Sequence, residues 1–160
     1  MNFEHLVQIN DPLNPLIDAL TREQLWTGLV LRAEHPQLFV QSLDSCTILS
    51  RDENVIVREL RYGSAVVRDR VTLTPDTRVH YEIAPTDSHV GGSLTMTIEQ
   101  PDALQLFVRF EYKTTLGQTD DGESPQTSEI VKSAYRENDI DTVRVIRQIT
   151  AAGRLAGGVH

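Results

Sequence analysis

Residues 55–73 read VIVRELRYGSAVVRDRVTL, and they decide the fold because two alternating segments flank one short break. The break, Gly63-Ser64, favours a two-residue type II′ hairpin turn, since glycine accepts a positive φ at the first turn position. A turn of this length fixes the register of the two strands, and residues opposite each other point to the same face. The pairs predicted on the inner face are Tyr62 with Ala65, Leu60 with Val67, Arg58 with Asp69, and Ile56 with Val71.

The same alternation continues over residues 43–115, where turn residues at 75–77, 91–92 and 100–102 separate further strands. One face of these strands is apolar and is predicted to point inward. Its members are Val71, Leu73, Val79, Tyr81, Ile83, Leu94, Met96, Ile98, Leu104, Leu106, Val108, Phe110 and Tyr112. The opposite face is mainly charged or hydroxyl-bearing. The pattern therefore predicts an antiparallel β-meander with one buried and one solvated face.

Residues 3–9 alternate in the same way and predict a first strand, which Asp11-Pro12 ends. A helix is predicted after Thr21, because Thr21 and Gln24 have the spacing of a capping box and apolar residues follow at helical intervals. Pro36 ends this helix and allows one more short turn. Two short helices are thus predicted between the first strand and the meander.

A last helix is predicted from Ser124-Pro125, with serine as the cap and proline in the first turn, to Gly153. At ~1.5 Å per residue it is about 40 Å long and can cross the whole sheet. Its predicted apolar stripe comprises Val131, Ala134, Tyr135, Val145, Ile146, Ile149 and Ala152. Asn138 and Thr142 fall inside the stripe, which indicates either a polar, ligand-holding pocket or a kink that turns Asn138 to solvent.

The composition argues against several classes of protein. With 15 Lys and Arg against 23 Asp and Glu, the net charge is −8, and without a basic cluster neither nucleic acid nor an anionic membrane is an expected partner. No apolar run approaches the ~18 residues of a membrane span and the N-terminus lacks signal-peptide features, so we expect a cytoplasmic protein. The single Cys46 and the spacing of the five histidines predict no metal site, and no cofactor is expected.

Six segments carry a resemblance to a known family: FEHLVQIN (3–10), QLWTGL (24–29), VRELRYG (57–63), RDRV (68–71), SLTMT (93–97) and KSAYRENDIDT (132–142). Together with the order of elements, they resemble the AtaL-like branch of the SRPBCC superfamily, the START-like proteins of the helix-grip fold. The resemblance implies an α+β fold, in which a seven-stranded curved antiparallel sheet wraps around the long C-terminal helix. It also implies an internal cavity between sheet and helix, which periodicity alone does not predict.

Arg58 and Asp69 are the most informative residues, because the predicted register places both on the buried face, opposite each other. A buried ion pair rarely stabilises a protein more than well-packed apolar side chains would, so the pair needs another explanation. Two interpretations stay open. The pair either anchors a carboxylate, hydroxyl or carbonyl group of a ligand, or it fixes the strand register near the rim of the sheet.

The expected ligand-binding residues combine polar and bulky side chains on the inward faces. They are His5, Arg58, Tyr62, Asp69, Tyr81, Met96, Phe110, Tyr112, Asn138 and Thr142. The resemblance implies one ligand-binding domain over residues 1–160, and the glycine-rich composition after Gly153 predicts a flexible tail at 153–160. We expect it to bind a small hydrophobic, aromatic or amphipathic molecule as a carrier or sensor. A second copy of the chain, forming a homodimer, is a further candidate partner.

Two alternative functions stay open. The resemblance permits an enzyme of the polyketide cyclase or dehydrase type, in which Arg58 polarises a carbonyl and Asp69 or His5 acts as base, although no catalytic motif is found. For His5, a hydrogen-bonded core position is the other possibility. A protein-interaction domain with a vestigial pocket is also open, but the polar outer face of the sheet disfavours it. The acidic residues 116–123 precede the last helix, where they are placed to act as a gate.

Overall fold

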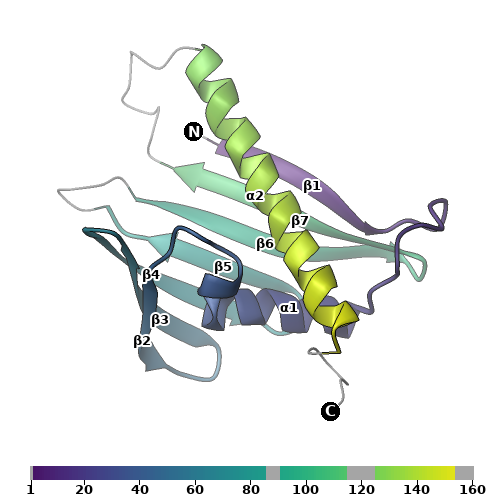
Figure 1. Ribbon diagram of the computed structural model, residues 1–160, viewed down its shortest axis with the longest axis horizontal. Coiled ribbons are helices and arrows are strands. Elements are labelled where there is room, and N and C mark those ends of the chain that lie inside the picture. Colours follow the sequence, from purple (N-terminus) through teal and green to yellow (C-terminus); the bar gives the residue numbers. More distant parts are fainter. Residues whose placement is uncertain (1, 86–90, 115–124, 154–160) are drawn as a thin grey trace.

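Seven antiparallel strands form one continuous sheet in the order β1-β7-β6-β5-β4-β3-β2 (Figure 1). The computed structural model describes residues 2–85, 91–114 and 125–153 of the chain. The strands are β1 (Asn2–Asn10), β2 (Ser45–Arg51), β3 (Val55–Tyr62), β4 (Ala65–Thr74), β5 (Arg78–Ile83), β6 (Gly92–Asp102) and β7 (Gln105–Thr114). Because β1 pairs with β7 and not with β2, these two sequence neighbours form opposite edges of the sheet. The predicted seven-stranded antiparallel sheet is confirmed.

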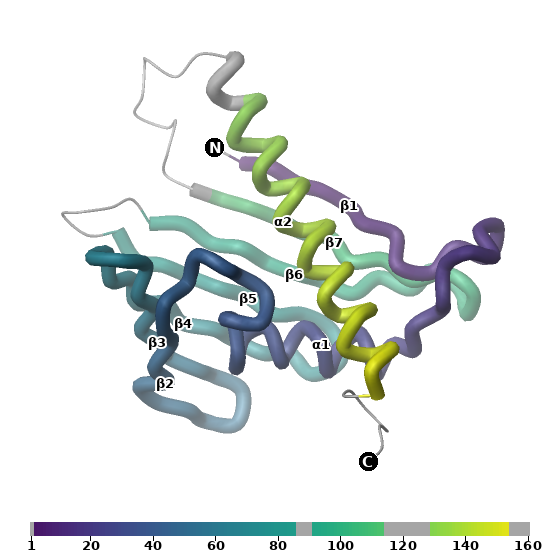
Figure 2. The backbone as a smooth tube through the Cα atoms, in the orientation of Figure 1, coloured from purple at the N-terminus to yellow at the C-terminus, as the bar shows by residue number. Residues whose placement is uncertain are grey.

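The helices are α1 (Arg22–Glu34), the 3₁₀ turn η1 (Pro36–Leu38) and α2 (Pro125–Ala151). The tube in Figure 2 shows α2 crossing the sheet obliquely, with α1 close to its C-terminal half, and α2 contacts both α1 and β1. The predicted helix-grip arrangement of the helices is therefore confirmed. Within the described residues, none of the helices has both the length and the apolar character needed to span a lipid bilayer.

Local signals at the helix ends match the structure. Thr21 Oγ1 accepts a hydrogen bond from Gln24 N, and Gln24 Oε1 accepts one from Thr21 N, both at 2.9 Å, so the predicted capping box is confirmed. Gly153 follows α2 with a φ of 74°, in the left-handed region that favours glycine at this position. The predicted cap Ser124, the proposed gate at 116–123 and the tail at 154–160 lie outside the described residues.

The β3–β4 hairpin has the predicted register, with Tyr62 opposite Ala65 and Arg58 opposite Asp69. Gly63 has a φ of 61° while Ser64 has no positive φ, as a type II′ turn requires. The inward position predicted for Leu104 is wrong, because this side chain is 68% exposed. The β6–β7 turn lies later than expected: Asp102 pairs with Gln105, and its side chain accepts hydrogen bonds from the two following backbone amides, N of Leu104 and of Gln105.

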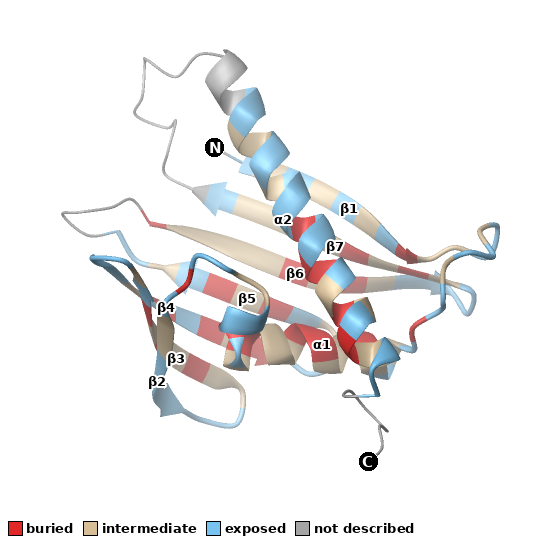
Figure 3. Cartoon of the chain, in the orientation of Figure 1, coloured by how far each residue is buried: buried red, intermediate tan, exposed pale blue. Residues whose placement is uncertain are grey.

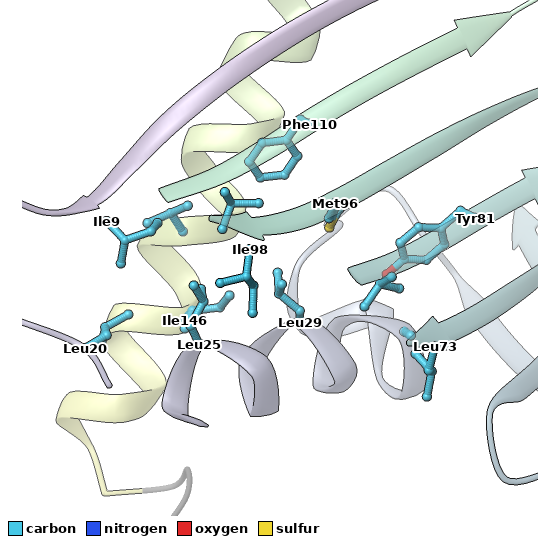
Figure 4. Close-up of a cluster of buried hydrophobic side chains, with 14 of the residues drawn as sticks. Ile9, Leu20, Leu25, Leu29, Leu73, Tyr81, Met96, Ile98, Phe110 and Ile146 are labelled. Carbon is cyan, nitrogen blue, oxygen red and sulfur yellow. The ribbon is translucent and has the colours of Figure 1, made fainter. Parts of the chain in front are cut away.

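The hydrophobic core fills the space between the inward face of the sheet and the two long helices (Figure 3). Met96 and Phe110 from the sheet meet Leu29 and Ile146 from the helices in this cluster (Figure 4). The helices cross closely at Gly28, where a Cβ atom would lie 2.7 Å from a side-chain carbon of Ile146. The core therefore leaves little free volume where α1 and α2 cross at Gly28.

The buried stripe of α2 differs from the predicted one. The buried residues are Asp139, Thr142, Val143, Ile146 and Ile149, which follow each other at helical intervals. Asn138, Ala134 and Ala152 are exposed, and α2 runs as one helix through this region. The expectation that Asn138 lies within the stripe is wrong, since the stripe is centred about one residue later. The polar residue in that place is Asp139.

Candidate functional site

A partly open pocket of about 350 Å³ lies against the inner face of strands β3 to β7. Tyrosines supply much of its wall: Tyr62, Tyr81 and Tyr112 come from the sheet, and Tyr135 comes from α2. The charged members of the lining are Arg58 and Asp69 from the hairpin and Arg32 from α1. Aliphatic side chains and the backbone around Gly92 complete it. The pocket therefore combines an aromatic lining with a small charged group.

The buried Arg58–Asp69 pair forms part of the pocket wall. Arg58 Nε donates to Asp69 Oδ1 at 2.8 Å, and Arg58 Nη2 donates to Asp69 Oδ2 at 2.5 Å. Arg58 Nη1 also donates to the Ala33 carbonyl oxygen at 2.9 Å, which ties the pair to the end of α1. Burial by itself would lower the pKa of Arg58, but the hydrogen bonds and charge of Asp69 raise it overall. Arg58 is thus held in its charged form.

Tyr81 lies between the charged group and the core. The guanidinium carbons of Arg32 and Arg58 lie 5.1 and 5.2 Å from the centre of its ring, within cation–π range. The Tyr81 hydroxyl oxygen is buried and has no hydrogen-bond partner among the described residues. A buried hydroxyl without a partner costs free energy, and such groups are uncommon in folded proteins.

A second polar cluster connects α2 to the sheet beside the pocket. Asp139 is 1% exposed, accepts a hydrogen bond from the Tyr112 hydroxyl, and has Oδ2 3.3 Å from His5 Nδ1. Burial raises the pKa of Asp139 to about 6, although the hydrogen bonds from Tyr112 and His5 oppose that shift. Burial and the nearby Asp139 also raise the pKa of Tyr112, so this hydroxyl stays protonated as a donor.

Tyr112 connects this cluster to the pocket. Its ring stacks on Tyr135 with centroids 4.0 Å apart and an interplanar angle of 4°. Phe3 packs against both rings, at 6.1 and 6.0 Å. The stack forms an aromatic wall, and the Tyr112 hydroxyl donates to Asp139, which does not belong to the described pocket lining. A flat apolar ligand could extend this wall by stacking.

The structure brings five of the predicted site residues together on the pocket wall: Arg58, Tyr62, Asp69, Tyr81 and Tyr112. The other predicted residues lie elsewhere. Met96 and Phe110 are fully buried in the closed core, because α1 and α2 pack directly over them. His5 Nδ1 lies 3.3 Å from Asp139 Oδ2 beside the pocket, and the partly exposed His5 side chain does not belong to the core cluster.

Asn138 and Thr142 line a separate, more polar depression of about 590 Å³ between α2 and the segment after η1. Thr142 Oγ1 donates to the Asn138 carbonyl oxygen at 3.0 Å and accepts from Arg32 Nε at 3.3 Å. The polar group of Thr142 is therefore satisfied by its own helix and by α1. Neither residue lines the tyrosine-rich pocket, and their contact with a ligand stays a prediction.

The sequence analysis did not select Arg32, Tyr135 or Asp139, which complete the two clusters. Arg32 follows Leu25 by seven residues and Gly28 by four, so helical periodicity places it on the buried face of α1. That spacing could have identified it. Tyr135 was assigned to the apolar stripe without a role in the site. Asp139 was missed because the predicted stripe of α2 was about one residue out of phase.

The fold defines the class of protein. The START superfamily protein from Mycobacterium smegmatis superposes with a TM-score of 0.62 at 8% identity, covering 92% of this chain and 98% of that chain. The Zhui aromatase/cyclase from Streptomyces sp. R1128 gives 0.59 at 20% identity, covering 99% of both chains. The di-domain ARO/CYC StfQ from the steffimycin biosynthetic pathway gives 0.64 at 10% identity, and the chain covers 49% of it, about half its length, with 91% of its own residues. At these identities the likeness establishes a START-like fold.

The family follows from a match over most of the chain. The chain belongs to the AtaL family, described as acetylaranotin biosynthesis cluster protein L, whose model matches residues 7–153. No curated protein matches the chain. The resemblance drawn from the six sequence segments is therefore confirmed for both the START-like fold and the AtaL-like branch.

Proposed function

We propose that the protein binds one small amphipathic molecule with a flat, apolar body in the tyrosine-lined pocket, as a carrier or sensor. The observation that carries this proposal is the lining: four tyrosines and aliphatic side chains surround about 350 Å³ next to a few charged groups. Small-molecule sites typically combine an apolar wall with a small number of well-placed polar groups. The volume is at the lower end of the usual ~300–1,000 Å³, which favours a compact ring system over a two-chain lipid.

The two polar clusters support the same proposal in different ways. Arg58 and Asp69 hold each other in place, so a ligand oxygen can approach a guanidinium that is already oriented. The Tyr112–Tyr135 stack offers a planar surface for a ring. The fold shared with proteins named aromatase/cyclases agrees with an aromatic or polyketide-type ligand.

The test begins with native mass spectrometry of the purified protein, where we expect a small molecule bound in a one-to-one complex. It continues with titration of the neutral fluorescent probe N-phenyl-1-naphthylamine. Leu94 lies on the pocket wall and Thr95 on the solvated face of the same strand. Leu94→Trp places an indole ring in the pocket and should strongly weaken both kinds of binding. Thr95→Trp places the same side chain on the opposite face of β6, where it replaces a hydroxyl bonded to His80, and should leave them unchanged. Binding that Leu94→Trp leaves unchanged would contradict the proposal.

A second candidate function, a cyclase- or dehydrase-like enzyme, is favoured by the chain of hydrogen bonds from His5 through Asp139 to Tyr112. It places a carboxyl group with a pKa of about 6 next to a tyrosine whose ring lines the pocket. A carboxyl group that titrates near neutral pH suits proton transfer. Asp69 is a poorer candidate base than predicted, because Arg58 occupies both of its oxygens.

Turnover separates the two functions. If the protein is an enzyme, Asp139→Asn should lower kcat on a linear poly-β-ketone substrate by about 100-fold or more while ligand affinity changes little. Loss of binding together with turnover, or no turnover by the wild-type protein, would leave the carrier or sensor function as the better account.

A further inference from the structure

The charge balance of the pocket identifies the chemical class of its ligand. Three ionised side chains belong to the described lining: Arg32 and Arg58 each contribute +1 and Asp69 contributes −1, which leaves a net charge of +1. Arg58 and Asp69 form a closed bidentate pair, and the third Arg58 hydrogen bond goes to a backbone carbonyl. The positive charge without an ion-pair partner in this lining therefore lies on Arg32.

The Arg32 guanidinium group makes its side-chain hydrogen bond through Nε and leaves its outer edge open. Nε donates to Thr142 Oγ1 at 3.3 Å, and the group lies over the Tyr81 ring. Among the carboxylates of the described residues, none forms an ion pair with Arg32. Neither Nη1 nor Nη2 of Arg32 donates a hydrogen bond to another described residue. These two nitrogens present the forked geometry that matches a carboxylate or sulfonate.

The field of Arg32 reaches several groups around the pocket. Burial raises the pKa of the Tyr62 hydroxyl, and the charges of Arg58 and Arg32 oppose that shift. Arg32 likewise opposes the upward shift of the Tyr112 pKa, which burial and Asp139 cause. Its charge also stabilises the ionised form of Asp139. Asp69 acts on Tyr62, and Asp139 on Tyr112, in the opposite sense, so the surroundings of the pocket combine fields of both signs and the positive one is centred on the arginines.

We infer that the ligand of this pocket is an organic anion, an aromatic or other flat apolar molecule with a carboxylate, enolate or comparable acidic group, and that Arg32 is the residue that selects it. Arg58 forms the polar end of the pocket, and Asp69 fixes the position of the Arg58 guanidinium group. This inference rests on the proposed function, since it names the ligand class of the same pocket. Arg32 lines both the pocket and the outer depression, so the selecting group can be reached from solvent.

Two probes that differ in charge test the inference. 8-Anilinonaphthalene-1-sulfonate and N-phenyl-1-naphthylamine share their ring system, and only the first carries a negative charge. We expect the wild-type protein to bind the sulfonate about tenfold or more tightly than the neutral probe, since a hydrogen bond to a charged group is worth that much. Dissociation constants and stoichiometry are measured by fluorescence titration and calorimetry.

Variants assign the preference to one residue. Arg32→Gln should reduce the ratio of the two dissociation constants to about twofold or less, while Arg32→Lys should keep part of the preference. Arg144→Gln is the matched control, because it removes the same charge from α2 at the outer depression, away from the pocket lining. Thermal unfolding checks that each variant is folded, and Arg32→Lys provides the test if Arg32→Gln is not.

The outcomes separate this inference from the proposed function. Equal or weaker binding of the sulfonate by wild type, or a preference that survives Arg32→Gln, overturns the anion inference while the pocket stays a binding site. If neither probe binds, or if Leu94→Trp leaves both affinities unchanged, the proposed function fails and the inference fails with it.

Discussion

Two buried carboxyl groups lie close to the same pocket, and their surroundings are opposite in kind. Asp69 receives two hydrogen bonds from the guanidinium group of Arg58, and both side chains are nearly inaccessible to water. Asp139 is buried as deeply but contacts a tyrosine hydroxyl and an imidazole. The first carboxyl has a permanent counter-charge, whereas the second depends on partners that are neutral or titratable. A fixed charge pair and a titrating group therefore flank one pocket from different strands of the sheet.

The two groups also connect different parts of the molecule. The Arg58–Asp69 pair joins neighbouring strands β3 and β4 and reaches the end of α1 through the Ala33 carbonyl. Asp139 joins α2 to β1 and β7 at the other edge of the sheet. The pair thus forms part of the pocket wall, and Asp139 links α2 to the sheet beside the pocket. Breaking either one should have a distinct signature.

The largest effect is expected from Asp69→Leu. It leaves the Arg58 guanidinium buried without a counter-charge, and removing one partner of a buried ion pair typically costs about 3–5 kcal/mol. We expect the free energy of unfolding to fall by that amount, measured by urea denaturation at pH 7. Arg58→Leu should have an effect of similar size, because it leaves the Asp69 carboxylate buried without a counter-charge.

The double variant Arg58→Met with Asp69→Leu is the control for that prediction. It removes both charges at once, so most of the loss should be recovered, apart from the hydrogen bond to the Ala33 carbonyl. A double variant as unstable as the single ones would show that the pair contributes more than mutual charge compensation. Charge compensation would then not be what distinguishes Asp69 from Asp139.

The next effect concerns pH and Asp139. Its pKa is about 6 in the folded protein, whereas an unperturbed aspartate carboxyl has a pKa of 3.8. A raised pKa means that the folded state favours the protonated form, so this contribution is present below about pH 4 and is lost as pH rises through about 6. The loss amounts to about 3 kcal/mol, since one pKa unit corresponds to ~1.4 kcal/mol.

Asp139→Asn isolates this contribution from the other carboxyl groups. The asparagine does not titrate, so the difference in unfolding free energy between variant and wild type should shift in favour of the variant between pH 4 and pH 7. Urea denaturation at several pH values measures the difference. A difference that stays constant over this range would mean that Asp139 titrates as in the unfolded chain, and that the cluster compensates a charge as fully as Arg58 does.

Sequence patterns predicted the sheet better than the last helix, and the reason is geometric. Strand periodicity is two, so the short turn at Gly63-Ser64 fixed the face of every residue in the hairpin, including Arg58 and Asp69. On α2, adjacent residues differ by ~100°, and several weakly apolar positions allowed the stripe to be drawn around Asn138 instead of Asp139. Leu104 is exposed because the β6–β7 turn lies later than predicted and includes it, so Leu104 does not belong to β7.

The charged end of the pocket was predictable only in part. The register brought Arg58 and Asp69 together. Helical spacing places Arg32 on the buried face of α1, but the packing angle that brings it to the pocket does not follow from a local pattern. Tyr112 was assigned to the inner face, yet its hydrogen bond to Asp139 depends on how α2 crosses the sheet. Contacts within the meander follow from local alternation, whereas contacts between the sheet and the helices need the tertiary structure.

The smallest effect is expected from Tyr112→Phe, which tests whether the hydroxyl group matters apart from the ring. The variant keeps the stack on Tyr135 and removes one hydrogen bond to a buried carboxylate, at a cost of about 1–2 kcal/mol at pH 7. Because that hydrogen bond lowers the pKa of Asp139, its loss should raise the pKa above about 6, which NMR titration of the carboxyl carbon would show. Tyr112→Leu removes the stack as well and should cost more. If Tyr112→Phe leaves both stability and the pKa unchanged, Asp139 is set by burial and His5 alone, and α2 is held over the pocket by packing and not by this hydroxyl.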